Sequence, residues 1–203
     1  MINNPLGFTK EINRELKVYE NLLKKWQNKF NLVSNNSIAD IWSRHILDSA
    51  QLFKLMPKEN INQITYDIGT GAGFPGVVLA ILGRTDMVLC DPNKKKCSFL
   101  QEVKNKLNLN MIIDNIRAEE LPVKSANIVL ARAVAPLEKL ISLSWPLLKK
   151  NGIAIFPKGK NWKNELISAQ KYFFMEYDLV KSITSEVSYI FVIKRIEKKI
   201  DKK

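Results

Sequence analysis

Asp67 is followed by glycines at 69, 71, 73 and 76 in the run YDIGTGAGFPGVVLAI, and residues of these types at this spacing can hold a nucleotide-like cofactor. Gly71, Gly73 and Gly76 spell G-x-G-x-x-G, the pattern expected for a dinucleotide. Asp67, Gly69, Gly71 and Gly73 also spell D-x-G-x-G-x-G, the pattern expected for S-adenosylmethionine. In both patterns the glycines let the backbone approach the ligand closely. The glycine pattern alone therefore leaves two cofactors open.

The acid at the start of this run distinguishes the two cofactors. Asp67 ends an apolar stretch directly before the glycines, where its carboxylate would repel the pyrophosphate of a dinucleotide. The sulfonium and ammonium groups of S-adenosylmethionine would instead be attracted to it. Asp91, which ends the stretch MVLCD, can accept hydrogen bonds from ribose hydroxyls, and this role suits either cofactor. The sequence therefore favours S-adenosylmethionine.

The sequence does not contain the residues that several kinds of methyl transfer require. No D/N-P-P-Y/F motif follows the fourth expected strand, so an exocyclic amine is not the expected acceptor. Neither Cys90 nor Cys97 follows a proline in that region, which disfavours a cysteine nucleophile. With one histidine and no acid–histidine cluster, we predict no metal site. The remaining class of acceptor is already a good nucleophile, such as a purine ring nitrogen, and catalysis would consist mainly of positioning.

The elements that must position these residues follow from the hydrophobic pattern. Two helical stretches, 9–30 and 37–56, precede a region where short apolar runs alternate with helical segments. That alternation predicts an α/β fold with a doubly wound, mostly parallel, Rossmann-like sheet. The expected strands are 63–68, 87–91, 110–114, 127–132 and 153–157, and the expected helices between them lie near 76–84, 93–107, 136–148 and 161–173.

The two ends of the chain depart from this alternation. Residues 176–184 and 186–195 are successive extended runs, which predict an antiparallel hairpin at one sheet edge, and the charged residues 196–203 are expected to fray. Residues 1–60 are interpreted as a helical appendage on a methyltransferase domain at 61–203, with one compact unit overall.

The composition of the chain limits its domain number, its cellular compartment and its class of partner. The 203 residues are 46% hydrophobic, which suits one globular domain, and the apolar runs are too short to span a membrane. The first ten residues lack the features of a signal peptide and there are only two cysteines, so we expect a cytoplasmic protein. The net charge of +12 is spread along the chain, and therefore it favours an anionic partner only weakly.

Six motifs in order carry a resemblance that spans nearly the whole chain: WSRHILDSAQL, DIGTGAGFPGVVLAI, CDPNKKKCSFLQEV, IRAEEL, ARAVAPL and FPKG. Together they resemble the bacterial small-subunit ribosomal RNA guanine-N7 methyltransferases, the family also called glucose-inhibited division protein B. The glycine motif is specific only to the superfamily, whereas its combination with R-H-I-L-D-S and A-R-A is more specific. The resemblance implies methylation of N7 of one guanine in the single-stranded decoding-region loop of 16S ribosomal RNA.

The same resemblance assigns expected roles to matching residues. Gly69 and Phe74 should line the cofactor, and Ala118 and Glu119 should meet its adenine end. Arg132 corresponds to the family's arginine beside the cofactor and the target base. The implied partner is 16S ribosomal RNA or the small ribosomal subunit, with no DNA or membrane partner, and we expect a monomer.

Further residues are candidates with competing interpretations. Arg132 closes an apolar strand, where an arginine is easier to explain as an anion contact than as core. Arg44 and His45 could present the target nucleotide, or His45 could simply contact Asp48 within its helix. The lysines that we expect to contact RNA phosphates, if they are more than a solvated surface, are Lys94, Lys95, Lys96, Lys158, Lys160 and Lys163.

Two other functions remain open from the sequence. A small-molecule methyltransferase could use the N-terminal helices as a lid, and it would be active without RNA. A non-catalytic RNA-binding factor for ribosome assembly could keep the fold as a scaffold, and it would transfer no methyl group. A nicotinamide-dependent enzyme is a more distant alternative.

Overall fold

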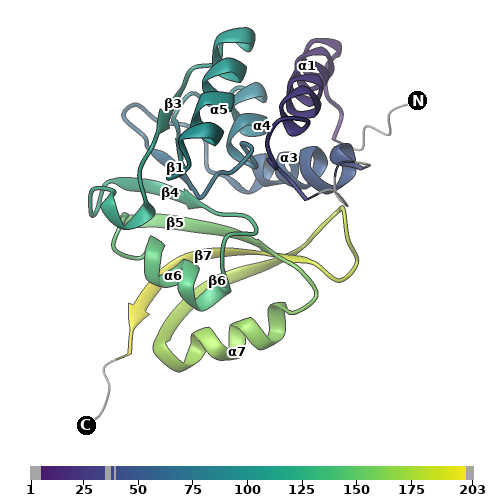
Figure 1. The fold of residues 1–203 in the computed structure, drawn as a ribbon. Coiled ribbons are helices and arrows are strands. Elements are labelled where there is room, and N and C mark those ends of the chain that lie inside the picture. Colours follow the sequence, from purple (N-terminus) through teal and green to yellow (C-terminus); the bar gives the residue numbers. More distant parts are fainter. Residues whose placement is uncertain (1–5, 35–37, 39, 200–203) are drawn as a thin grey trace.

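The computed structural model describes residues 6–34, 38 and 40–199, and its centre is a seven-stranded sheet in the order β3-β2-β1-β4-β5-β7-β6 (Figure 1). The five strands β1 to β5 pair in parallel, and β7 and β6 extend the sheet in antiparallel fashion. This arrangement confirms the predicted doubly wound, mostly parallel α/β fold. The strand bounds are β1 Thr65–Ile68, β2 Met87–Cys90, β3 Met111–Asp114, β4 Ala126–Leu130, β5 Leu148–Lys158, β6 Phe173–Lys181 and β7 Tyr189–Lys198.

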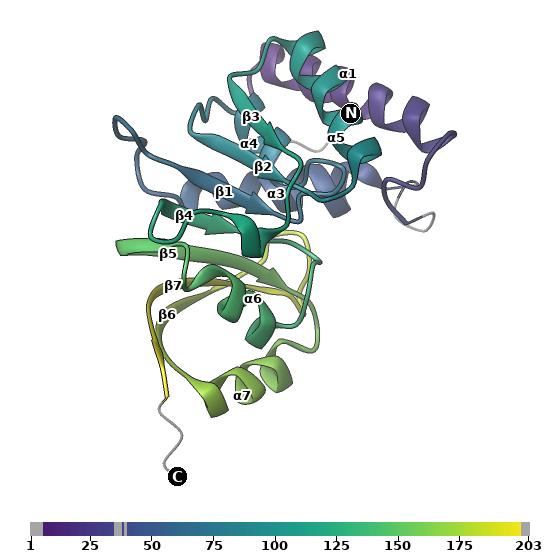
Figure 2. The same ribbon diagram turned by 60° about the vertical axis from the view of Figure 1, so that its left-hand side comes forward.

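Helices cover both faces of this sheet, as Figures 1 and 2 show from two directions. Successive β4 residues point to opposite faces, so Ile128 joins one hydrophobic core and Val129 joins the other. The first core packs against α1, α4 and α5, and the second packs against α6 and α7. Within the described residues no helix has the length and apolar character needed to cross a membrane. The helix bounds are α1 Lys10–Gln27, α4 Gly76–Ile81, α5 Lys94–Leu107, α6 Leu137–Ser144 and α7 Trp162–Tyr172.

The N-terminal helix α1 is part of the main core. Thr9 caps it by accepting a hydrogen bond from the Ile12 amide. Leu16, Tyr19 and Leu23 on one face are fully buried in the core that also contains α4 and α5. The Tyr19 hydroxyl donates a 2.6 Å hydrogen bond to the carbonyl of Ala72 in the glycine loop. The expected appendage thus directly supports the loop that it precedes in sequence.

Replacing Tyr19 by phenylalanine tests this support. The change leaves the buried Ala72 carbonyl without its donor, so we expect the free energy of unfolding to fall by about 1–3 kcal/mol. Urea denaturation would measure it. Tyr172 is half exposed and serves as the matched control, because Tyr172→Phe should change stability by less than about 0.5 kcal/mol. Equal effects of the two substitutions would contradict the role of the Tyr19 hydroxyl.

The second helical stretch is irregular, unlike the single helix predicted over 37–56. A π-helical segment η1 (Trp42–Leu47) leads into the short α3 (Asp48–Ala50) and the 3₁₀ segment η2 (Gln51–Leu55). The chain becomes extended at Met56, where the predicted stretch ends before Pro57. The predicted opening at Ser37 lies outside the described residues. π turns are uncommon and are found frequently at functional sites. The π-helical geometry of η1 therefore favours a functional role for Arg44 and His45, which lie within it.

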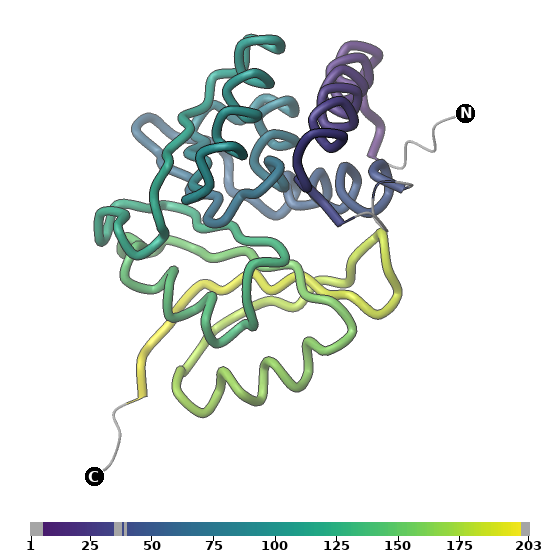
Figure 3. The backbone as a smooth tube through the Cα atoms, viewed as in Figure 1, coloured from purple at the N-terminus to yellow at the C-terminus, as the bar shows by residue number. Residues whose placement is uncertain are grey.

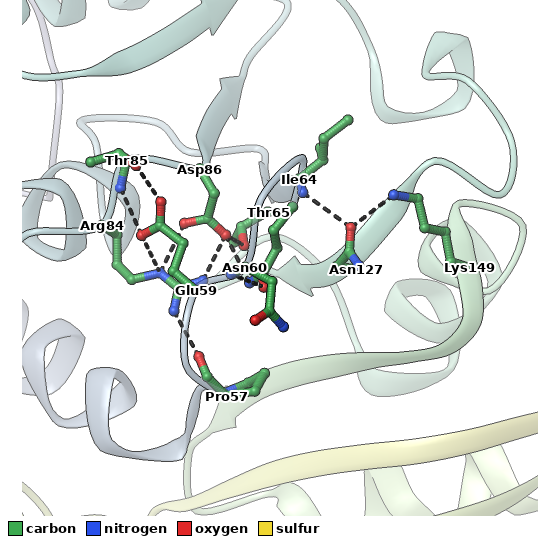
Figure 4. Close-up of polar contacts among 11 residues, drawn as sticks. Pro57, Glu59, Asn60, Ile64, Thr65, Arg84, Thr85, Asp86, Asn127 and Lys149 are labelled. Carbon is green, nitrogen blue, oxygen red and sulfur yellow. Dashed lines mark hydrogen bonds and ion pairs between the residues drawn. The ribbon is translucent and has the colours of Figure 1, made fainter.

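A buried arginine joins the end of this stretch to the sheet. Arg84 forms an ion pair with Asp86 at 2.6 Å and donates to the carbonyl of Pro57 at 2.8 Å (Figure 4). Asp86 also accepts hydrogen bonds from Thr65 and Gln63. Arg84 therefore has a structural role at the amino-terminal end of the parallel strands, on the side opposite to the glycine loop.

The C-terminal hairpin is longer than its sequence pattern indicated. β7 continues through Ile196 to Lys198, where fraying was expected, and Met175 of β6 pairs with Ile196. The prediction of fraying was wrong for these three residues, because the preceding β6 begins at Phe173 and provides partners for them. Figure 3 shows the hairpin loop reaching back toward the N-terminal helical segments.

Candidate functional site

The glycine loop lies at the carboxyl end of β1, where ligands bind in sheets of this type. Asp67 is fully buried, and its Oδ2 accepts hydrogen bonds from the Thr70 hydroxyl at 2.6 Å and the Gly76 amide at 2.8 Å. Gly76 allows this contact, since a Cβ there would stand 2.7 Å from Asp67 Oδ2. Asp67 thus caps the loop, while its Oδ1 is buried and has no hydrogen-bond partner in the part of the chain that the structure describes.

Asp91 follows β2 and holds the same loop from the neighbouring strand. Its Oδ2 accepts from the Gly71 amide at 3.0 Å, and its Oδ1 accepts from the Asn93 amide at 2.9 Å. The Lys96 ammonium lies 3.7 Å from Oδ2. Each carboxylate oxygen keeps a second lone pair, so both oxygens can still accept from a ligand hydroxyl. The local capping role and the expected ribose role are therefore compatible.

The segment after β3 lies on the same edge of the sheet. Ala118 and Glu119 form the 3₁₀ turn η3 (Ala118–Glu120), in which Ala118 is half-buried and Glu119 is exposed. Asn115, just before this turn, donates a 2.9 Å hydrogen bond to the carbonyl of Asp91. The structure thus places the η3 region beside the Asp91 region at the same edge of the sheet.

Arg132 connects the end of β4 with the π-helical segment. Its Nη1 donates to the carbonyl of Arg44 at 3.0 Å and to Asp48 Oδ2 at 3.1 Å, and its Nη2 donates to His45 Nδ1. The guanidinium also lies 5.3 Å from the centroid of the Phe74 ring, and the His45 ring stacks on Phe74 at 4.8 Å. The structure therefore brings together four of the expected residues from three separate segments.

Two nitrogens of this cluster have no hydrogen-bond partner among the described residues. Arg132 Nε and His45 Nε2 are both buried and unpaired. Of the two interpretations of His45, the contact with Asp48 within the helix is not the one that the structure shows, because His45 Nδ1 and Asp48 Oδ2 each accept a hydrogen bond from Arg132. The arginine comes from the end of β4, a third segment.

The hairpin loop fixes the cluster from the other side. Asp48 Oδ1 accepts from the Thr184 hydroxyl at 2.8 Å and from Gln51 Nε2 at 2.9 Å. Gln51 in turn donates to the Ser182 hydroxyl and accepts from the Ile183 amide. Sequence reasoning missed these hairpin partners, since polar loop residues more than 100 positions away carry no local signal of the contact.

The protonation of His45 is a measurable consequence of this geometry. Burial, together with the positive charges of Arg132 and Arg44, lowers the pKa of His45 to about 4. It is the only histidine of the chain, so its ring resonance in NMR spectra needs no assignment. We expect a titration midpoint near pH 4, and a shift back toward the ordinary value of about 6.5 in Arg132→Ala. A midpoint near 6.5 in the unaltered protein would contradict the buried, Arg132-bonded neutral imidazole.

A pocket of about 250 Å³ lies next to this cluster, between the end of β5 and the hairpin loop. Asp48 and Arg132 line it on one side, and Lys158 and Tyr189 line it on the other. Lys158 forms a 2.6 Å ion pair with Glu165 and donates to the Ala135 carbonyl, with 9% of its side chain exposed. This geometry disfavours the predicted contact of Lys158 with RNA phosphate, because its ammonium group is held by Glu165 of α7 and by the Ala135 carbonyl of the β4–α6 loop.

The other expected phosphate contacts remain at the surface. Lys95 lies over the Phe30 ring and Lys163 lies over the Trp162 ring, with Lys94 and Lys160 also exposed. They fall in two groups, one at the start of α5 and one at the start of α7. Within the described ranges, Lys96 alone of these five lysines has an acidic partner, at Asp91.

The fold and this site define a class of protein. A ribosomal protein L11 methylase from Lactobacillus delbrueckii subsp. bulgaricus superposes with a TM-score of 0.56 at 18% identity, covering 75% of this chain and 77% of that one. M. jannaschii TYW2, solved in complex with AdoMet, gives a TM-score of 0.57 at 17% identity and 80% coverage of both chains. The chain thus has the fold of the class I methyltransferases, as predicted.

Sequence comparison then gives the family. The family model described as "GidB: rRNA small subunit methyltransferase G" matches residues 12–190. The ribosomal RNA small subunit methyltransferase G of Ruegeria sp. (strain TM1040) is 37% identical over 201 residues, 97% of each chain. That of Rhodospirillum centenum is 39% identical over 178 residues, 88% of this chain and 82% of the relative. The chain belongs to this family of ribosomal RNA methyltransferases, which confirms the resemblance noted in the sequence.

Proposed function

We propose that this chain transfers a methyl group from S-adenosylmethionine to N7 of a guanine in the single-stranded decoding-region loop of 16S ribosomal RNA. The observation that carries the proposal is the cluster formed by Arg132, His45 and Phe74 beside the glycine loop. It joins a cofactor-type loop to a polar pocket in a member of a ribosomal RNA methyltransferase family. We also propose that the enzyme acts in the cytoplasm as a monomer.

The residues of the glycine loop fit the proposed cofactor. The unpartnered Oδ1 of Asp67 is a buried acceptor, and a cationic ligand suits a buried carboxylate while an anionic one does not. Asp91 would accept from the ribose hydroxyls, and Ala118 and Glu119 would border the adenine. Gly69, Gly71, Gly73 and Phe74 would form the floor of the site. The cofactor supplies an electrophilic methyl group, and the protein's task is to place the acceptor in line with it.

The affinity for the cofactor should depend on the ionisation of Asp67. Burial raises the pKa of Asp67 to about 7, although the hydrogen bonds from Thr70 and Gly76 and the charge of Arg132 act in the opposite direction. A cation favours the ionised carboxylate, so affinity should rise by up to about tenfold per pH unit below pH 7 and level off above it. Calorimetric titration of S-adenosylmethionine from pH 5.5 to 8 would show this. In Asp67→Asn the affinity should no longer rise with pH through the ionisation of residue 67. An identical dependence of affinity on pH in the parent and in Asp67→Asn would refute the role of Asp67.

The pocket next to Arg132 is the proposed place for the acceptor guanine. Guanine N7 has a free lone pair, so no general base has to remove a proton there. The ring becomes cationic when N7 is methylated, and a lone arginine beside it would oppose that change. Asp48, 3.1 Å from Arg132 Nη1, offsets the arginine charge and removes this penalty. The unpaired Nε of Arg132 remains available to donate to an acceptor on the base or its phosphate.

The test uses small subunits, and RNA extracted from them, from cells that lack the protein. Each is incubated with the enzyme and methyl-labelled S-adenosylmethionine, and the RNA is then cleaved at N7-methylguanine with borohydride and aniline. We expect one new cleavage in the decoding-region loop, and none with Asp67→Ala.

The alternative outcomes separate the competing functions. Label incorporated without that cleavage would refute N7 as the acceptor atom. Cofactor binding without transfer to either RNA form would favour a small-molecule methyltransferase. RNA binding that persists unchanged in Asp67→Ala, with no transfer by the parent, would indicate a non-catalytic assembly factor.

A further inference from the structure

A second groove lies at the amino-terminal end of β4 and β5, at the opposite end of the parallel strands from the glycine loop. Its volume is about 960 Å³, and its lining comes from the segment before β4, the turn after α6, the first half of β5, and strands β6 and β7. None of the residues expected or found at the catalytic site belongs to this lining. It is therefore a separate feature of the surface.

The groove arises from two irregularities in the sheet. β7 pairs with β5 from Tyr189 opposite Lys158 to Ile193 opposite Ala154, and beyond Ile193 it pairs only with β6. The first half of β5 is thus left without its antiparallel neighbour. The register between β4 and β5 also shifts between Ala126 and Ile128, so that residues 149–152 bulge from the ladder. Asn151, with φ of 66°, turns the chain within this bulge.

The bulge and the loop facing it place lysines in the groove. Lys124 and Lys150 are exposed, and neither has an acidic partner at ion-pair distance in the described part of the chain. Lys149 donates a 2.9 Å hydrogen bond to Asn127 Oδ1, which also accepts from the Ile64 amide (Figure 4). Because Asn127 is neutral, this bond orients the Lys149 ammonium group without cancelling its charge.

The remaining charges of the lining are largely balanced. Lys194 pairs with Asp178 at 2.7 Å, and Arg195 pairs with Glu197. Glu176 also lines the groove, and its single negative charge compares with the three positive charges of the lysines on the bulge and its facing loop. The uncompensated charge is therefore positive, and it is concentrated on Lys124, Lys149 and Lys150.

An aromatic side chain borders these lysines. Trp145, in the turn after α6, lines the groove with 42% of its surface exposed. Large exposed aromatics beside a basic groove are the combination that binds single-stranded nucleic acid, because bases stack on the ring while cations hold the phosphates. An acidic protein segment would use the lysines but would have no specific use for the exposed ring.

We propose that this groove is a second RNA-docking surface, which binds an unpaired segment of the ribosomal RNA distant from the methylated guanine. Lys124 and Lys150 contact its phosphates, and Trp145 stacks on one of its bases. The inference rests on the proposed function, which makes ribosomal RNA the substrate. It explains how an enzyme with a small acceptor pocket could gain affinity from the RNA around its target.

The test measures binding of protein-free small-subunit ribosomal RNA as a function of salt, and methylation of small subunits, with the full chain. In Lys124→Glu/Lys150→Glu, loss of two phosphate contacts should lower the slope of log affinity against log salt by about 1.4. The Michaelis constant for subunits should rise about tenfold with kcat unchanged. Trp145→Ala should weaken RNA binding about fivefold or more with an unchanged salt slope, because stacking is not ionic.

The matched control is Lys10→Glu/Lys106→Glu, an equal change of charge at two exposed lysines of α1 and α5. It should retain the parent's slope and Michaelis constant, and S-adenosylmethionine affinity should be unchanged in every variant. Equal losses in the control, or no loss in the groove variants, would overturn the proposal. Weaker methylation of subunits with unchanged binding of protein-free RNA would also overturn it, in favour of an acidic protein surface. If the parent transfers no methyl group but the slopes still differ, the groove stands and the proposed methylation fails.

Discussion

Arg132→Ala is expected to lower kcat for methyl transfer by about 100- to 1000-fold while leaving S-adenosylmethionine affinity within about threefold of the parent. Electrostatic positioning groups in a dry site typically contribute this much. Arg132 holds the carbonyl of Arg44, the carboxylate of Asp48 and the ring of His45 together over Phe74. Its removal frees the π-helical segment from the end of β4, and the acceptor pocket loses one wall. Single-turnover transfer to small subunits would give the rate.

Two further substitutions separate charge from geometry. Arg132→Lys keeps a cation but cannot donate from two nitrogens at fixed angles to Asp48 and His45, so it should recover less than about a tenth of the parent rate. Arg14→Ala removes an exposed arginine of α1 and should leave kcat unchanged. A full rate in Arg132→Lys would show that charge alone matters. A loss of cofactor affinity as large as the loss of kcat would show that Arg132 acts on the cofactor or on the fold and not on the acceptor.

The hydrophobic pattern was sufficient to predict the fold because the sheet has two covered faces. The central strands β2 and β4 are buried on both sides, so they form nearly continuous apolar runs, and the intervening helices bury one side. The hydrogen-bonding class of residues 41–55 could not be predicted in this way. A π turn and an α turn bury nearly the same residues, and the difference follows from the contacts of η1 with β4 and the hairpin loop.

In the candidate site too, the residues at strand ends could be predicted, whereas the contacts made by tertiary packing could not. Asp67 and Asp91 were predictable, because the ends of parallel strands meet at one edge of the sheet whatever the loops do. The partners of Arg132 were not, because His45, Asp48 and Thr184 come together only through tertiary packing. Lys158 illustrates the same limit. Its sequence context suggests a surface cation, and only the approach of α7 reveals that Glu165 neutralises it.

Gly73→Ala should abolish measurable cofactor binding and lower the free energy of unfolding by about 2–6 kcal/mol. The backbone at Gly73 has φ of +97°, which side chains of L-residues rarely adopt. A Cβ there would also stand 2.4 Å from Val77 Cγ2 and 2.9 Å from Leu100 Cδ2. Val77 and Leu100 are fully buried, so they can move only by disturbing the core beneath the loop. Urea denaturation and calorimetric titration of S-adenosylmethionine would measure the two effects.

Gly83 provides a control that separates backbone strain from crowding. Its φ of +105° is close to that of Gly73, but a Cβ there meets no atom within 4 Å. Gly83→Ala should therefore show only the conformational cost, about 1–3 kcal/mol, with cofactor affinity unchanged. The additional loss in Gly73→Ala then measures the packing of the glycine loop on α4 and α5. If the two substitutions destabilise equally, the loop is not held by the core, and the loss of cofactor binding must come from the altered backbone at Gly73 alone.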